Sequence, residues 1–180
     1  MPTVRTQNAI KAAGVDTAGF SLVEILVVVM VLLVIAAIAI PNLVHAKLRA
    51  NEAAAVASVR TIQTAQTMYA NSYPEVGYSA NLANLGSHGS TCEKPTSTSA
   101  CIIMDEALTS GLKSGYIFDL VNDGNKPSLG YTVNATPESG STGRCSMSSS
   151  ESGEIHLTVV GAGGGGSRSL GSGGGGGCEL

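Results

Sequence analysis

The chain has 180 residues, a formal net charge of −3, four cysteines and no tryptophan. Its length allows one modest domain plus an anchoring element. The acidic pI of about 5.5 provides no basic field for binding nucleic acid, so no nucleic-acid partner is predicted. Aromatic residues make up only 4% of the chain, which favours a small, loop-rich domain over one large packed core.

The first two segments are a short polar leader, residues 1–19, and an apolar segment, residues 20–41. From Phe20 to Ile40 the only polar residues are Ser21 and Glu24. A helix of this length extends about 31 Å, close to the thickness of the hydrocarbon core of a bilayer. Its apolar side chains favour insertion by roughly 5–9 kcal/mol, against a cost of about 3 kcal/mol for one acid. We therefore expect a membrane-spanning helix.

Residues 42–71 show the pattern of an amphipathic helix that continues the first one. Charged residues such as Lys47, Arg49, Glu52 and Arg60 are expected on other faces than the apolar stripe. Proline lacks a backbone N–H, so Pro41 is expected to kink the combined helix. The expected stripe comprises Val44, Leu48, Ala55, Val59, Ile62, Gln66 and Tyr69.

The remainder of the chain predicts a loop, a sheet and a tail. Residues 72–114 show no clear period and are expected to form a loop. Residues 115–160 contain alternating apolar runs between turn signals, which predict an antiparallel sheet of three or four short strands. A weaker strand is expected at residues 144–148. Residues 161–180 form a glycine-rich tail. The predicted fold class is α+β, with a long N-terminal helix packed on a small antiparallel sheet.

Glu24 is the unusual residue of the apolar segment, because an acid within a membrane-spanning run usually has a function. Two simpler interpretations stay open. One is a signal peptide cleaved after Ala46, although the run is long and acidic for that role. The other is a plain single-pass membrane anchor, in which Glu24 would have no function.

The stretch "GFSLVEILVVVMVLLVIAAIAIPNLVHA", residues 19–46, resembles the N-terminal motif of type IV pilins and type II secretion pseudopilins. The resemblance implies that a membrane-embedded prepilin peptidase cuts between Gly19 and Phe20 and methylates the new amino terminus of Phe20. It also implies that Glu24 pairs with the terminal ammonium of a neighbouring subunit during assembly. The pilin-like fold expected from this resemblance agrees with the predicted α+β class.

The resemblance further implies a structural role without enzymatic activity or cofactor. The expected function is a type IV pilus subunit for adhesion or twitching motility, and the alternative is a type II secretion pseudopilin. Implied partners are further copies of the chain, the peptidase, membrane lipid, and an inner-membrane assembly platform with its motor. The subunit would lie in the inner membrane before assembly, and then in an extracellular pilus or a periplasmic pseudopilus. A membrane-anchored enzyme is a third and weaker interpretation.

The cysteines Cys92, Cys101, Cys145 and Cys178 all follow the apolar segment and suggest disulfides in an oxidising compartment. Four cysteines allow three connectivities. The short spacing between Cys92 and Cys101 favours a bond within the loop, which leaves Cys145 for Cys178. A disulfide near the C-terminus also resembles that of type IV pilins. A free or interchain Cys178 stays open.

Other motifs are weaker. The loop that contains Asp119, Asp123 and Asn125 suggests calcium only faintly, because Asp-Gly is more often a simple turn. The "GAGGGG" run at 161–166 matches a dinucleotide fingerprint formally but lacks the helix that should follow it. No catalytic set and no metal site are predicted. The histidines His45, His88 and His156 fall on different expected elements.

Overall fold

The computed structural model describes residues 19–87, 92–160, 168–169 and 178. The chain divides into two compact units, one ending at Pro41 and the other covering Asn42–Leu180. The helix α1, Leu22–Ser72, contributes to both, with Pro41 inside it. His88 and the 161–166 glycine run lie outside the described residues.

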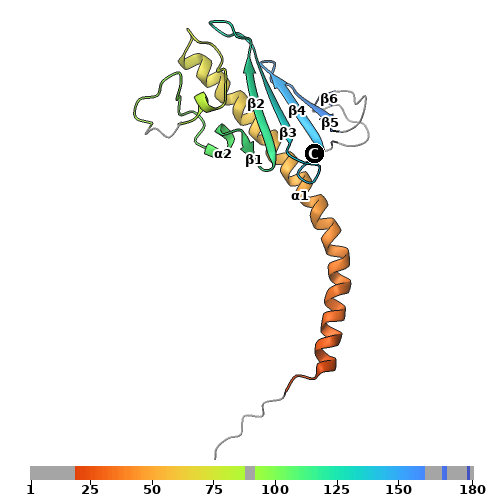
Figure 1. Cartoon of the computed structure of the whole chain (residues 1–180). Coiled ribbons are helices and arrows are strands. Elements are labelled where there is room, and N and C mark those ends of the chain that lie inside the picture. The colour runs from red at the N-terminus through yellow and green to blue at the C-terminus, as the bar shows by residue number, and fades with distance from the viewer. Residues whose placement is uncertain (1–18, 88–91, 161–167, 170–177, 179–180) are drawn as a thin grey trace, which may run out of the picture. The chain divides into compact units, whose positions relative to one another are not determined.

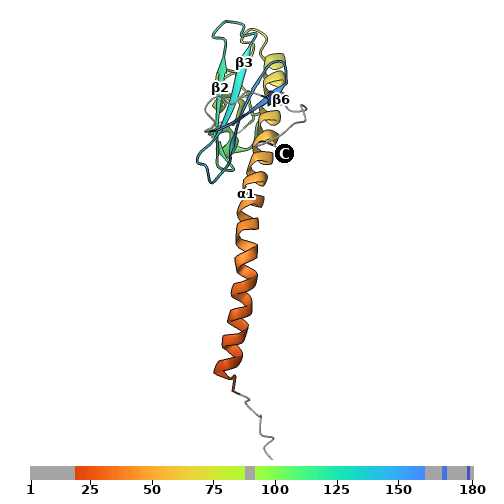
Figure 2. The ribbon, with the colours of Figure 1, turned by 90° about the vertical axis from the view of Figure 1, so that its right-hand side faces the viewer.

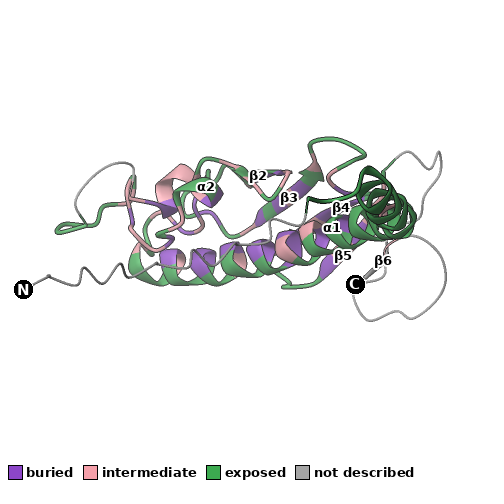
Figure 3. Ribbon diagram, turned by 90° about the horizontal axis from the view of Figure 1, so that it is seen from below, coloured by how far each residue is buried: buried purple, intermediate pink, exposed green. Residues whose placement is uncertain are grey.

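The part of α1 that belongs to the first unit is exposed at every described residue except Ala36, which is intermediate. Its large apolar side chains keep between 47% and 80% of their surface accessible from Leu22 to Ile40. Figure 3 shows these turns in green, whereas purple residues recur along the later turns. The α1 helix is long and apolar enough to cross a membrane, and no residue of its most apolar stretch is buried.

The second unit contains an antiparallel sheet in which each strand pairs with the next one along the chain. The later part of α1 packs on one face of this sheet (Figures 1 and 2). This arrangement confirms the predicted α+β class. The strands are β1 (Leu112–Lys113), β2 (Tyr116–Asn122), β3 (Tyr131–Pro137), β4 (Cys145–Ser150), β5 (Ile155–Val159) and β6 (Arg168–Ser169).

The strands alternate as the sequence pattern predicts, because successive side chains of a strand point to opposite faces. In β2, Tyr116, Phe118 and Leu120 are buried, and the residues between them are not. The register pairs Phe118 with Ala135 and Leu120 with Val133, so these side chains share the inner face. The weak strand expected from residue 144 is present as β4, which begins one residue later and ends at Ser150.

The face that α1 presents to the sheet largely matches the predicted stripe. Six of the seven expected positions are buried, and Val44 is 52% exposed. Glu52 was predicted on another face, and this prediction is wrong, because its side chain is only 6% exposed. A carboxylate can be buried when it accepts hydrogen bonds, and Glu52 Oε1 accepts one from the backbone N–H of Arg144 at 2.9 Å. The stripe therefore includes one acid.

Residues 72–114 differ from a plain loop. They contain the 3₁₀ turn η1 (Ala83–Leu85), the short helix α2 (Glu106–Thr109) and the strand β1. Elements of two to four residues are too short to show a period in the sequence. Ser114 and Gly115 both have positive φ, 53° and 73°, as in the two-residue turns that suit a tight hairpin. This turn returns the chain from β1 into β2, so the sheet begins earlier than predicted.

The sheet also extends further than the three or four strands expected, to six. The additional strands are short edge strands of two residues each, β1 and β6. Backbone pairing with a longer neighbour holds such strands, and two residues cannot show an alternation. The β6 strand falls within residues 161–180, where only a tail was expected.

Candidate assembly segment

The N-terminal end of α1 carries the residues expected to act in assembly. The helix begins at Leu22, and the carbonyl of Ser21 accepts hydrogen bonds from the backbone N–H groups of Glu24 and Ile25, at 3.0 and 3.3 Å. Gly19 and Phe20 precede the first helical turn, and Phe20 is 75% exposed. The Gly19–Phe20 peptide bond is therefore in non-helical backbone, where a peptidase can draw it out as an extended strand.

Gly19 has no role in the packing of the described chain. A Cβ built on it would meet no atom within 4 Å, and its φ is not in the left-handed region. Ser21 lies between it and the helix, so Gly19 is not the residue at which α1 begins. A requirement for glycine at this position would therefore come from outside the folded chain, for example from a peptidase that needs close backbone approach.

Ala46 gives a contrast. The bond after it, at which a signal peptidase would cut, lies in the interior of α1, between turns that are helical on both sides. Cleavage there would require the helix to open, because proteolysis needs an extended backbone. The two candidate bonds thus differ in the described chain: the Gly19–Phe20 bond lies before α1, and the bond after Ala46 lies inside it.

Glu24 lies in the first turn of α1. The free backbone N–H groups at a helix N-terminus carry partial positive charge, which favours an acid there by about 0.3–1 kcal/mol in water. This gain offsets part of the cost of an acid in a bilayer, which is about 3 kcal/mol at the centre of a span and smaller for Glu24, near the end of the apolar run. A full opposite charge at the same depth is the partner that would offset the remainder.

Pro41 lies inside α1, at the boundary between the two compact units. Without an N–H, it cannot donate the backbone hydrogen bond to the carbonyl four residues earlier. The helix is nevertheless assigned on both sides of it. The kink at this position stays a prediction.

The second unit holds both disulfides that the spacing favours, Cys92–Cys101 and Cys145–Cys178. Cys145 is fully buried on the inner face of β4, and Cys178 is half-buried and packs against the same core. The second bond therefore joins Cys178 to the inner face of β4, so Cys178 is neither free nor bonded to another chain.

Sequence reasoning missed a set of polar contacts that attach loops to α1. Gln66 is fully buried, and its side-chain amide forms two hydrogen bonds with the backbone of Ser79. Oε1 accepts from the N–H of Ser79 at 2.8 Å, and Nε2 donates to the carbonyl of Ser79 at 3.1 Å. Asn51 Nδ2 donates to the carbonyl of Thr142 at 2.9 Å. A buried amide or acid on an otherwise apolar stripe was the available signal, since such groups need partners.

The β3–β4 loop, residues 138–144, is fixed to α1 by two of these side chains, Asn51 and Glu52. It also closes over Tyr116, whose hydroxyl donates to the carbonyl of Cys145 at 2.9 Å. Burial, together with the nearby Glu52 carboxylate, raises the pKa of Tyr116 to about 12. The hydroxyl therefore stays protonated and keeps donating at neutral pH.

The calcium interpretation gains no support from the described residues. Both oxygens of Asp123 accept hydrogen bonds from its own loop: Oδ1 from the N–H of Asn125, and Oδ2 from Asn125 Nδ2 and the N–H of Leu129. Hydrogen bonds with Ser128 and Asn125 lower the pKa of Asp123 to about 2. Asp119 points from β2 to the outer side of the sheet. Within the part of the chain that the structure describes, no three acids, histidines or cysteines are grouped as metal ligands.

Comparison with known proteins gives one informative similarity. The chain is 37% identical over 71 residues to the type II secretion system core protein G of Pectobacterium carotovorum subsp. carotovorum. The match covers 38% of this chain and 46% of that protein, so the chain spans less than half the length of this relative. No family model matches the chain, and no solved structure does. The similarity supports a relationship to pilins and pseudopilins.

Proposed function

We propose that this chain is a structural subunit of a helical filament of the type IV pilin and pseudopilin class. The observation that carries the proposal is the exposed apolar part of α1, in which Glu24 is the only charged residue up to Ile40. Water is a poor solvent for such a surface. Lipid would cover it before assembly, and the corresponding helices of other copies would cover it afterwards.

Cleavage between Gly19 and Phe20 would create the charge that Glu24 needs. The new amino terminus of Phe20 is a cation only four residues from Glu24. In hydrocarbon, an ammonium and a carboxylate stabilise each other far better than either is stabilised by lipid. A neighbouring copy shifted along the filament axis can supply this ammonium. Methylation of Phe20 would keep the positive charge.

In the proposed filament, the apolar contacts and the ion pair of Glu24 would have different roles. Aliphatic packing supplies adhesion but little alignment, because one apolar ridge resembles the next. A single buried polar pair penalises every register in which it is broken, as a buried asparagine does in coiled coils. Glu24 would therefore select the register of the filament. The second unit, with its own core, would lie on the outside and needs no catalytic centre or cofactor for this role.

Two kinds of filament fit, and different observations favour them. The Cys145–Cys178 bond favours a type IV pilus for adhesion or twitching motility, since a pilus surface outside the cell benefits from an anchored C-terminus. The similarity to core protein G favours the second candidate, a periplasmic pseudopilus of type II secretion. We place the pilus first. Both would require the prepilin peptidase, an assembly platform and a motor in the inner membrane.

Deletion of the gene in its native host tests the proposal. Electron microscopy of sheared surface material and the profile of secreted proteins are compared with those of the parent and of a complemented strain. Loss of surface filaments that contain this chain supports the pilus. Intact surface filaments with loss of protein secretion support the pseudopilus. If neither changes, and the protein is recovered only as a membrane-bound monomer, the filament proposal is wrong.

A further inference from the structure

The end of the second unit that lies nearest the apolar segment along the chain carries a group of exposed cations. Lys47 and Arg49 are exposed on α1, and Arg144 is exposed at the end of the β3–β4 loop. We call these three residues the basic collar. None of them forms an ion pair within the described part of the chain. The topology of a membrane anchor does not explain them, because Arg5 and Lys11 balance Lys47 and Arg49 across the apolar segment.

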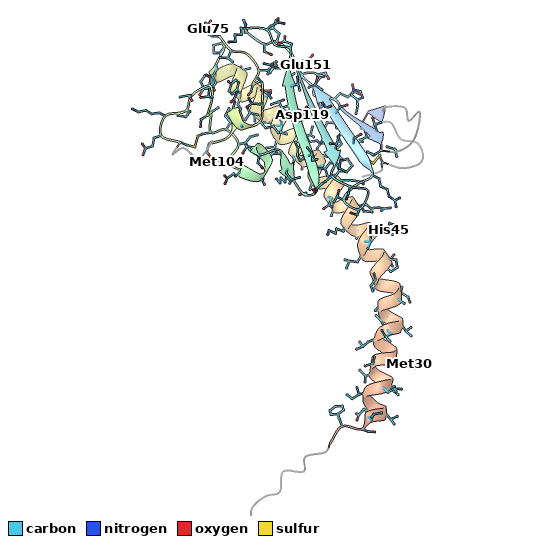
Figure 4. All side chains as sticks on the ribbon, in the orientation of Figure 1. Met30, His45, Glu75, Met104, Asp119 and Glu151 are labelled. Carbon is cyan, nitrogen blue, oxygen red and sulfur yellow. A yellow bond between two sulfur atoms is a disulfide. The ribbon has the colours of Figure 1, made fainter. Side chains whose placement is uncertain are left out.

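The collar is built from two segments that are far apart in sequence. Asn51 and Glu52 of α1 bind the backbone of Thr142 and Arg144, each at 2.9 Å. Arg49 is only three residues before Glu52, which is about 5 Å along a helix. The backbone of Arg144 is therefore held against the turn of α1 that follows Arg49. Figure 4 places His45, which belongs to this stretch of α1, at the opposite end of the unit from Glu75 and Glu151.

The connectivity of the chain limits the distance between the collar and the apolar run. Lys47 is seven residues after Ile40, the last residue of the apolar run, which is about 10 Å along the helix. Headgroups occupy the first several ångströms outside the hydrocarbon core. A long cationic side chain at this height reaches the phosphates. Among the described residues of α1 from Lys47 to Glu52 and of the 138–144 loop, the acids are Glu52, which is buried, and Glu138, which is exposed.

We propose that the basic collar binds the anionic headgroups of phospholipids at the surface of the membrane that holds the unassembled subunit. The inference rests on the proposed membrane-anchored function and adds the chemistry of the lipid. Each cation near an anionic surface gains binding free energy that salt screens. The far end of the unit has more exposed acids than cations, with Glu75, Asp123 and Glu151 exposed there beside the exposed Lys126. This charge distribution would hold the collar end toward an anionic bilayer.

The test uses the full chain in lipid nanodiscs that hold one copy each. Discs of phosphatidylcholine are compared with discs that contain about 30% phosphatidylglycerol, and hydrogen exchange is measured over residues 138–147. The collar variant is Lys47→Gln, Arg49→Gln and Arg144→Gln. The matched control, Arg60→Gln, Lys94→Gln and Lys126→Gln, removes as much charge from exposed positions elsewhere, including one on α1.

We expect anionic lipid to slow exchange by about tenfold in the parent and the control, and not in the collar variant. About 0.5 M salt should abolish the difference. Equal slowing in the collar variant, or no effect of lipid in the parent, would overturn the proposal. Slowing by inorganic phosphate in neutral discs would indicate a free-anion site instead. Slowing in neutral discs that appears only with two copies per disc would indicate that the acidic end of a second chain is the occupant.

Failure of the collar and failure of the membrane anchor give different results. If the chain does not co-elute with the discs at all, residues 20–41 do not insert, and the proposed function itself is wrong. If the chain inserts but exchange does not respond to lipid charge, only the collar inference is wrong.

Discussion

The two units of the molecule use one helix in opposite ways. In the first unit, α1 is apolar on every side and buries nothing within the described chain. In the second unit, the same helix is apolar on one face only, and that face is covered by the sheet. A helix that is apolar all round must find lipid or other chains. The comparison separates the part of α1 that the fold of the chain covers from the part that it leaves exposed.

The polar side chains of the two units also differ in where their partners lie. The second unit satisfies its buried polar side chains internally: none of the described ones lacks a hydrogen-bond partner. Glu52 and Gln66 hold loops in place through backbone groups. Glu24, in the first unit, is an acid whose expected partner belongs to another molecule. One acid thus serves folding and the other is proposed to serve assembly, although both lie on α1.

The largest effect is expected from Glu24→Ala in the first unit. We expect filaments to be lost, because the ammonium of a neighbour would have no partner, while leader cleavage and the stability of the second unit stay as in the parent. Filament yield by shearing and electron microscopy is the measurement. Ser21→Ala, which removes the only other polar side chain between Phe20 and Ile40, is the control and should assemble. Normal filaments from Glu24→Ala would remove the proposed role of the acid.

The next largest effect should come from the C-terminal disulfide. Cys145 and Cys178 are separated by 33 positions, and Cys92 and Cys101 by 9. Loop-closure entropy assigns these bonds about 4 and about 3 kcal/mol. Cys178→Ser should therefore lower the free energy of unfolding more than Cys92→Ser does, as measured by urea titration of the full chain in detergent. Because the chain has no tryptophan, circular dichroism is the suitable signal.

Gly143→Ala should disturb the second unit alone. A Cβ at this position would lie 2.1 Å from the hydroxyl of Tyr116, which is fully buried and cannot move away. Overpacking of this kind costs about 1–3 kcal/mol. Gly140→Ala, in the same loop with nothing within 4 Å, is the matched control and should be neutral. Equal stability of the two variants in urea titration would show that the loop is not held against Tyr116.

The smallest effect is a dependence on alkaline pH. Burial raises the pKa of both Tyr116 and Tyr131 to about 12. Because these values exceed the unfolded value of about 10, their contribution is complete below pH 10 and is lost as the pH rises toward 12. The second unit should therefore lose stability in that window. In Tyr116→Phe the slope should be shallower, and an unchanged slope would argue against this cause.

Particular residues show how far sequence reasoning reached. The alternation in β2 and the spacing along α1 were readable because burial repeats over seven or more residues. Edge strands of two residues, β1 and β6, repeat nothing and owe their form to the longer strands beside them. Glu52 was misplaced because its charge predicts exposure, and only the fold brings the N–H of Arg144 to it. The roles of Gly19, Phe20 and Glu24 depend on other molecules and stay predictions.

The N-terminus of the native protein tests the central claim most directly. Mass spectrometry of the chain purified from its host, with filaments and membranes analysed separately, identifies the first residue and its modification. We predict a chain that begins at Phe20 and carries one methyl group on its terminal nitrogen. A native chain that begins at Met1 would contradict this prediction, because its terminal ammonium would not lie four residues from Glu24. A chain that begins after Ala46 would also contradict it, because it would lack Glu24.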